Sequence, residues 1–147
     1  MLSLTKKTDY ALIAICHLAE RNGAVVSARE IAAAYTLPTA LVMNVLKTLH
    51  HKGVLTSRRG TKGGYSLAVD LADISLLELI ECLEGPVHLT QCTTTEGCAD
   101  SPGPCRIAEK CPIRGPITAL HDAVLGFLKD MKLADIVKTN GHARAGR

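Results

Sequence analysis

Residues 27–67 read SAREIAAAYTLPTALVMNVLKTLHHKGVLTSRRGTKGGYSL, and this stretch decides the fold. Ser27 followed three residues later by Glu30 is a capping-box pattern, which predicts a short helix that runs through Ala34. The residues Leu37-Pro38-Thr39 then break the chain, because a residue before proline avoids helical backbone angles. The pattern therefore predicts a short helix, a tight break and a restart.

The restarted helix is predicted from about Pro38 to His51, and Gly53 follows it as a terminating residue. Its expected inward-facing residues are Leu41, Val45, Leu46 and Leu49. A supporting amphipathic helix is predicted over residues 8–21, because its apolar side chains fall on one helical face. Two short helices joined by a tight break, with a supporting helix before them, are typical of a helix-turn-helix.

A β-hairpin is predicted directly after this unit. Residues 54–58 and 65–69 have strand character, and the glycine-rich basic tip 59–64 lies between them. A hairpin that follows a helix-turn-helix is a wing. We therefore expect a mainly α fold, α+β only through the wing: a winged helix-turn-helix.

Charge is distributed unevenly along the chain, although the net charge is only +3. Residues 1–69 hold nine Lys or Arg and three acids, whereas residues 70–112 hold two basic residues and eight acids. A basic front half indicates a polyanionic partner. The N-terminus shows no signal-peptide core, and no apolar run reaches about eighteen residues, so we expect a cytoplasmic protein.

Double-stranded DNA is the expected partner, because the N-terminal half of such a helix enters the major groove and a basic wing can meet the minor groove. Asn44 could pair with adenine, and Lys47 could meet a phosphate or guanine. Val42 is expected to be exposed with them. The alternatives are an ordinary solvated helix face and a solubilising hairpin. The predicted DNA-binding set is Lys6, Lys7, Ser27, Thr39, Ala40, Met43, Asn44, Lys47, Arg58, Arg59 and Lys62.

Two more helices are predicted after the wing. Ser75 and Glu78 form a second capping box, and Gly85-Pro86 ends that helix. The last strong helix is predicted from Pro112 to Lys132. Its apolar residues recur at intervals of four and three, the period of a coiled coil, which predicts a partner helix in a homodimer. These residues are Ile113, Ile117, Leu120, Val124, Phe127 and Met131.

We accordingly divide the chain into four parts. They are a winged helix-turn-helix domain (1–86), a cysteine-rich loop (87–111), a dimerisation helix (112–138) and a tail (139–147). The tail TNGHARAGR lacks the apolar residues of a packed helix and is expected to be disordered.

The cysteine-rich loop contains four thiols between positions 92 and 111: Cys92, Cys98, Cys105 and Cys111. A glycine- and proline-rich loop without an apolar run cannot order itself by burying surface. A metal, an iron–sulfur cluster or disulfides could tie it down, and cytosolic thiols more often bind metal or react than form structural bridges. The absence of Cys-x-x-Cys makes a zinc knuckle less natural, and a redox dithiol stays open. Cys16 and Cys82 lie on apolar helix faces and are expected to be core residues.

Several segments of the chain resemble the bacterial winged-helix regulators that sense iron–sulfur clusters, the family of the iron–sulfur cluster regulator, the nitric-oxide-sensitive repressor and the SUF-system regulator. The resemblance is closest to the SUF branch and spans roughly residues 1–137. The segments are Leu4-Thr5, Thr8-Asp9-Tyr10-Ala11-Leu12, Leu37-Pro38, Val45-Leu46-Lys47, Arg59-Gly60, Lys62-Gly63-Gly64-Tyr65, Leu83-Glu84-Gly85-Pro86 and Cys111-Pro112-Ile113-Arg114.

The resemblance implies a homodimeric repressor of cluster-assembly or stress genes that binds a near-palindromic operator. It implies an iron–sulfur cluster, with two irons rather than four, held by Cys92, Cys98, Cys105 and Cys111. The family usually offers three cysteines and another fourth ligand, so this chain departs from its pattern, as it does with Met43-Asn44 in place of Glu-Gln. Asp9, an acid that reaches the partner's cluster in some members, and His121 are further ligand candidates. A first-turn acid that complements the helix dipole is the alternative for Asp9.

The alternative function is a cluster-free winged-helix regulator that senses thiol oxidation or a small ligand. An enzyme is not expected, because the sequence shows no nucleophile–base constellation and no phosphate-binding loop.

Overall fold

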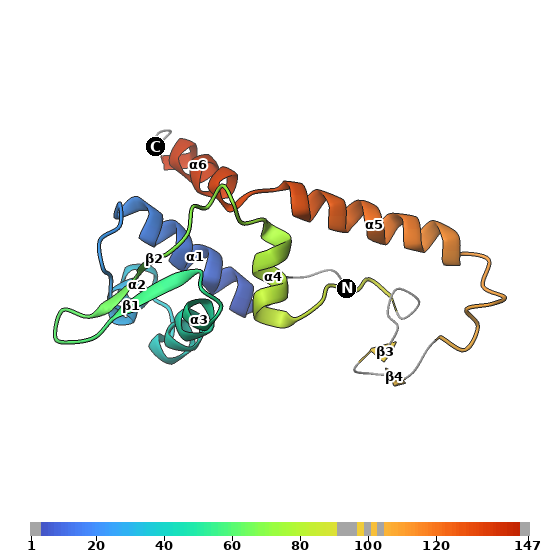
Figure 1. The fold of residues 1–147 in the computed structure, drawn as a ribbon, viewed down its shortest axis with the longest axis horizontal. Coiled ribbons are helices and arrows are strands. Elements are labelled where there is room, and N and C mark those ends of the chain that lie inside the picture. The colour runs from blue at the N-terminus through green and yellow to red at the C-terminus, as the bar shows by residue number, and fades with distance from the viewer. Residues whose placement is uncertain (1–3, 91–96, 99–100, 103–104, 145–147) are drawn as a thin grey trace.

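The computed structural model describes residues 4–90, 97–98, 101–102 and 105–144 (Figure 1). The helices of its N-terminal half pack around a shared core that also includes the first hairpin. In chain order the elements are α1 (Lys6–Glu20), α2 (Ala28–Tyr35), α3 (Thr39–His51), β1 (Leu55–Arg58), β2 (Gly64–Leu67), α4 (Leu76–Glu84), β3 (Gly97–Cys98), β4 (Ser101–Pro102), α5 (Arg114–Asp130) and α6 (Leu133–Arg144). The expected mainly helical winged helix-turn-helix is confirmed.

The helix-turn-helix is formed by α2 and α3. The Ser27 hydroxyl caps α2 by accepting a hydrogen bond from the Glu30 backbone N–H at 3.2 Å. Thr36 ends the helix in the left-handed region at φ 54°, which turns the chain into α3. Ile31 of α2 and Leu46 of α3 are fully buried in the core beneath α1.

One expectation about α3 is wrong. Val42 is 1% exposed and Leu41 is 46% exposed, the reverse of the predicted orientation. Residues 41, 45 and 49 and residues 42, 45 and 49 both form an apolar stripe at helical spacing. The two stripes differ only in whether Leu41 or Val42 faces the core. Packing against α1 and α2 selects the second stripe, which sequence periodicity alone does not distinguish.

The wing is the antiparallel pair β1–β2, in the register Leu55↔Leu67 to Arg58↔Gly64. Tyr65 also exchanges two backbone hydrogen bonds with Val26, at 2.8 and 2.9 Å, which attach the wing to the segment before α2. A Cβ on Gly64 would collide with the Val26 carbonyl, so glycine is required for this close approach.

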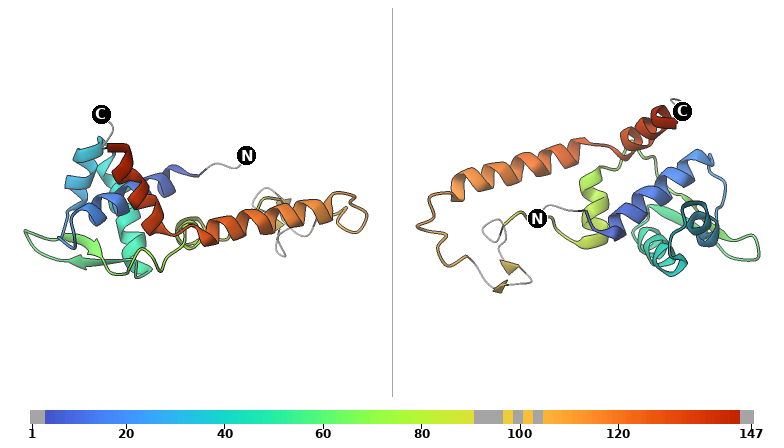
Figure 2. Two further views of the ribbon diagram at one scale, coloured as in Figure 1. Left: turned by 90° about the horizontal axis from the view of Figure 1, so that it is seen from above. Right: turned by 180° about the vertical axis from the view of Figure 1, so that it is seen from behind.

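We call residues 4–84 the winged body and residues 105–130 the arm. Figures 1 and 2 show α5 leaving the winged body as a long single helix. It is anchored at its C-terminal end, where the Leu76 N–H donates to the Met131 carbonyl at 2.8 Å and the Leu133 N–H donates to the Ile74 carbonyl at 3.0 Å. The opposite end of α5 lies far from this anchor and follows residues 105–113, which include Cys105 and Cys111; we call residues 92–111 the cysteine segment (Figure 1).

The sequence had led us to expect that α5 is the last element of regular structure, and this expectation is wrong. The helix α6 follows it and runs to Arg144, so the expected disordered tail from residue 139 is wrong for residues 139–144. Leu133 is 1% exposed, and Ile136 and Val137 pack against the core. Once these apolar residues hold the first turns on the body, adding further helical residues costs little. None of the helices in the described ranges combines the length and the apolarity that a membrane crossing requires.

Candidate functional site

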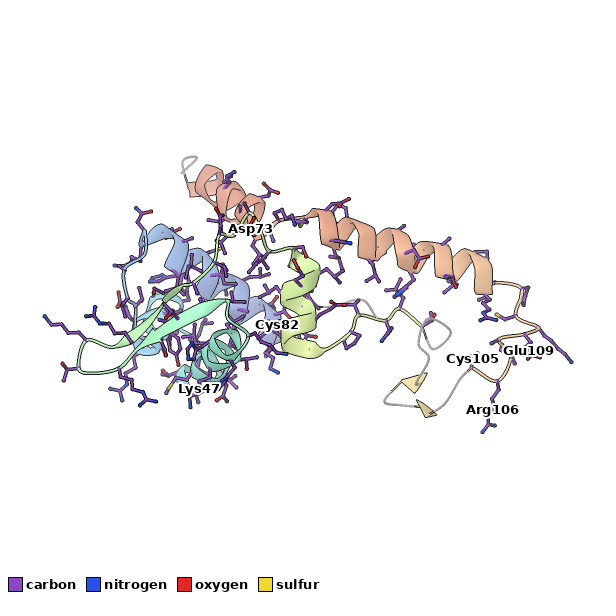
Figure 3. All side chains as sticks on the ribbon, viewed as in Figure 1. Lys47, Asp73, Cys82, Cys105, Arg106 and Glu109 are labelled. Atoms are coloured by element: carbon purple, nitrogen blue, oxygen red, sulfur yellow. The ribbon has the colours of Figure 1, made fainter. Side chains whose placement is uncertain are left out.

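The outer face of α3 is open and carries both polar and apolar side chains. Ala40, Met43, Asn44 and Lys47 are exposed, and Thr39 is half-buried at the start of the helix. Figure 3 shows Lys47 at the outer edge of α3, away from α4. Apart from Val42, the residues predicted to face outward on this helix therefore do so. Leu41 joins them as an apolar member that the sequence reasoning had placed inside.

The wing projects away from the helices as a hairpin (Figure 1), and the predicted basic residues lie at and beside its tip. Arg58, Arg59 and Lys62 are all exposed. The Gly63 N–H donates to the Gly60 carbonyl at 3.0 Å and closes the tip loop. A tight basic tip next to an exposed helix is the arrangement that a winged helix presents to a nucleic acid.

The start of α1 contacts the end of α4. Thr5 and Thr8 both donate hydroxyl hydrogen bonds to the Glu84 carboxylate, the first at 2.5 Å. The Lys7 ammonium donates to the Leu83 carbonyl at 3.0 Å, so this predicted phosphate contact is engaged within the protein. Lys6 is exposed, and the Ser27 hydroxyl is half-buried as the α2 cap.

The cysteine segment is described in part. Cys105 and Cys111 are free, half-buried thiols in a series of turns before α5. The Arg114 guanidinium donates to the Ala108 carbonyl at 3.4 Å across these turns. Cys98 lies in β3, which pairs with β4, whereas Cys92 lies outside the described residues. Within the described part of the chain no three His, Cys, Asp or Glu side chains converge as a metal site.

The two helix cysteines are distinct from this segment. Cys16 in α1 and Cys82 in α4 are half-buried, and neither forms a disulfide. Burial raises the pKa of the Cys82 thiol, which opposes the weaker lowering by the charge of Lys52. A thiol with a raised pKa is a poor nucleophile and metal ligand at neutral pH.

Asp9 and His121 were the remaining ligand candidates. Asp9 is exposed in the first turn of α1, where a carboxylate complements the helix dipole. His121 is 8% exposed, stacks on His88 with ring centroids 6.2 Å apart, and keeps a buried Nδ1 without a hydrogen-bond partner. The structure therefore pairs His121 with His88, near the start of the cysteine-rich loop.

An apolar groove of about 660 Å³ lies between residues 84–90 and α5. Large apolar side chains on the arm are exposed: Ile113 is 59%, Leu120 is 52% and Phe127 is 63% exposed. A soluble chain rarely leaves such a stripe uncovered. The groove is lined among others by Ile80, Val87, Leu89, Ile117, Leu120 and Val124.

Sequence reasoning missed two residues at the edges of this site. Glu84 was noticed only as part of a motif, yet it receives both α1 threonine hydroxyls. His50 was not considered, yet its ring joins α3 to β1. A histidine in the last turn of the helix, directly before the wing, was the available signal.

Comparison with known proteins identifies a family and relatives that this chain resembles. Residues 4–139 match the model of the Rrf2 family, described as iron-dependent transcriptional regulators. The chain is 28% identical to the transcriptional regulator NsrR of Bacillus subtilis, over 93% of this chain and 91% of that protein. It is 28% identical to the transcriptional regulator IscR of Photorhabdus laumondii, over 92% of this chain and 79% of that protein.

A solved structure agrees with these relatives. CymR, described as the global cysteine regulator of Bacillus subtilis, superposes with a TM-score of 0.71 and 26% identity, over 95% of this chain and 98% of that chain. The family and the named relatives are transcriptional regulators and not enzymes. The family match covers nearly all of the winged body, the arm and the start of α6, so this chain belongs to the Rrf2 family of transcriptional regulators.

Proposed function

We propose that the chain is a homodimeric, cytoplasmic DNA-binding repressor whose cysteine segment holds an iron–sulfur cluster that controls DNA affinity. The observation that carries the proposal is the joint presence of an open basic winged helix and a thiol-bearing segment at the free end of α5. The winged helix can bind DNA and the thiols can bind iron, and the helix α5 connects the two parts.

The DNA interface consists of the α3 face and the wing. Asn44 and Lys47 reach base edges or phosphates in the major groove, and Arg59 and Lys62 approach the neighbouring minor groove or its phosphates. Lys6 adds a phosphate contact at the start of α1. The exposure of these side chains supports this assignment.

The donor chemistry of the segment fits a cluster. Thiolates are the ligands that iron–sulfur clusters prefer, and Cys92, Cys98, Cys105 and Cys111 supply four of them on a short segment. The free state and partial exposure of Cys105 and Cys111 support the fit. When bound, the iron–sulfur cluster would order this segment, so that the order would depend on the supply of iron and on damage by oxygen or nitric oxide.

The exposed stripe of the arm supports a dimer. Ile113, Leu120 and Phe127 are spaced by seven residues, which keeps them on one side of a coiled coil. A two-fold dimer through α5 presents two α3 helices, so the operator is a near-palindrome.

The body offers a path from the segment to α3. Glu84 ends α4 directly before the chain leaves for the cysteine-rich loop, and it holds the start of α1 through Thr5 and Thr8. A change of order in the loop would pull on this contact, and α1 packs directly on α3. A hundredfold difference in DNA affinity between the protein with its cluster and the protein without it corresponds to about 2.7 kcal/mol of coupling free energy.

The experiment is anaerobic purification, followed by a visible spectrum, iron and sulfide analysis, and gel shifts of the holo and apo forms. We expect a cluster spectrum that Cys105→Ser abolishes and that the matched control Cys82→Ala retains, with both variants still dimeric. Colourless protein without iron or sulfide after reconstitution would end the cluster proposal. Equal DNA affinity of holo and apo forms would end the sensing proposal alone.

A second function is favoured by the likeness to the cysteine regulator CymR. In this alternative the chain is a cluster-free regulator whose segment responds to thiol oxidation or a small ligand. Iron-free protein whose DNA binding changes with peroxide and returns with a dithiol would select it.

A further inference from the structure

His50 lies at the junction of α3 and the wing. Its Nδ1 is 3.0 Å from the Leu55 carbonyl oxygen, and its Nε2 is 3.2 Å from the Ser57 hydroxyl oxygen. Leu55 and Ser57 both belong to β1. A single half-buried imidazole therefore links the last turn of the DNA-reading helix to two residues of the first wing strand.

The direction of one of these hydrogen bonds is fixed. A carbonyl oxygen only accepts, so Nδ1 carries a hydrogen and donates to Leu55. In the neutral imidazole, Nε2 then has no hydrogen and accepts from the Ser57 hydroxyl. In the imidazolium, Nε2 donates and the Ser57 oxygen accepts. The charge of His50 therefore decides whether the Ser57 hydroxyl hydrogen points inward or is free to point outward.

Ser57 is exposed, next to Arg58 at the base of the wing tip. A phosphate oxygen can only accept a hydrogen bond, so it suits Ser57 when the hydroxyl hydrogen points outward. The elements that contain His50, Leu55 and Ser57, together with β2, hold no Asp or Glu that could favour the imidazolium. The helix α4, which also packs against α3, carries Glu78, Glu81 and Glu84. A phosphate would be the nearby anion that favours the imidazolium.

We propose that His50 and Ser57 form a proton-linked phosphate contact. On DNA binding, His50 takes up one proton from solvent at Nε2, and Ser57 donates its hydroxyl hydrogen bond to a phosphate oxygen. No covalent bond forms or breaks. The inference rests on the proposed use of the wing in DNA binding and adds a pH dependence to it.

Other groups near His50 titrate or carry charge and define the controls. The His51 and Tyr65 rings lie 5.8 and 6.3 Å from it. Lys47 and Lys52 belong to the same helix end, and Arg58 follows Ser57. As residue types, lysine, tyrosine and arginine have reference pKa values well above pH 8, whereas the reference pKa of histidine lies between about pH 6 and pH 8. His51 is therefore the neighbour that must be separated from His50.

The test measures the affinity for a duplex that the wild-type protein selects from a random-sequence pool, at constant ionic strength from about pH 8 to about pH 6. We expect wild-type affinity to rise as pH falls, by at most about tenfold per pH unit for each proton taken up. Ser57→Ala and His50→Gln should flatten this rise, whereas the control His51→Ala should keep it. Thermal unfolding of each variant checks the fold, and Ser57→Ala leaves the bond from His50 to Leu55 in place.

The outcomes separate this inference from the proposed function. A wild-type affinity without pH dependence, or a Ser57→Ala variant with the full wild-type rise, overturns the proton-linked contact and leaves DNA binding intact. Failure of the wild type to select or bind any duplex at any pH overturns DNA binding and this contact together.

Discussion

The winged body and the arm follow different rules of stability. In the body, Ala11, Ile31, Leu46 and Leu49 are 0% exposed and belong to one continuous core. In α5, His121 is the one residue that is buried, and the large side chains of Leu120 and Phe127 are exposed. The body buries its apolar surface within one chain, whereas the arm leaves part of its apolar surface exposed.

The hydrogen bonds show the same contrast. Those of the body join residues far apart in sequence, such as Thr5 and Glu84 or Tyr65 and Val26. Those of residues 105–114 join near neighbours, such as Ala108 to Cys105. Among the described residues, long-range hydrogen bonds therefore join the parts of the winged body, and local ones order residues 105–114.

The largest expected effect comes from a pair of core and arm variants. Leu46→Ala removes a fully buried side chain of α3 and should lower the free energy of unfolding by roughly 2–5 kcal/mol. Phe127→Ala, at 63% exposure in this chain, should leave the fold of the body intact and weaken the dimer by roughly tenfold or more. Urea unfolding followed by circular dichroism measures the first, and sedimentation velocity measures the second.

Leu41→Ala is the matched control for Leu46, because it lies on the same helix with 46% of its side chain exposed. Its effect should stay within about 0.5 kcal/mol. If Phe127→Ala left the sedimentation of the protein unchanged at all concentrations, the arm would not be the dimer interface, and the contrast between the two regions would need another explanation.

A smaller effect is expected at the wing tip. Arg59→Ala should weaken DNA binding by roughly tenfold and reduce the salt dependence by about one phosphate contact, while the visible spectrum of the holo form stays the same. Arg106→Ala, an exposed arginine of the arm, is the control and should leave DNA affinity unchanged. Titrations at several salt concentrations measure both. Normal binding by Arg59→Ala would show that the wing does not contact DNA.

Much of the body was predictable because local signals mark its elements. The Ser27 and Ser75 caps, the Pro38 break and the glycine tip of the wing each act within a few residues, and each lies where the sequence placed it. The orientation of α3 was not fully predictable, because Leu41 and Val42 are both apolar and the choice between them depends on α1 and α2. The helix α6 was missed because the body, and not its own sequence, holds its first turns.

The site was predictable in its residue types and not in its connections. The basic residues of the wing and the exposed face of α3 follow from periodicity and composition. The Glu84 contacts join residues 79 and 76 positions apart, and no local pattern predicts such pairs. The roles of Cys92 and Cys98 stay predictions, because Cys92 lies outside the described residues and Cys98 is described only through its backbone.

The smallest effect concerns Glu78, where body and arm meet. Its carboxylate accepts hydrogen bonds from the Ser75 backbone N–H and from the Ser75 hydroxyl, each at 2.7 Å. These bonds, the backbone one most, hold the pKa of Glu78 below its usual 4.5; burial opposes them, and the charges of Lys132 and Lys129 at the arm's anchored end add to them. Because the pKa is lower in the folded state, the stabilisation is complete above about pH 4.5 and is lost as pH falls through the folded value.

Glu78→Gln should therefore cost less than about 1 kcal/mol at neutral pH, since the group is largely exposed and its charges are screened. The difference in unfolding free energy from the wild type should shrink as the pH falls below about 4.5. Glu81→Gln, an exposed neighbour on the same helix, is the control and should show no such convergence. Lys129 and Lys132 act on Glu78 only while the arm is anchored. If the difference in unfolding free energy between the wild type and Glu78→Gln stayed constant down to low pH, neither the cap nor the anchored arm would depend on this carboxylate.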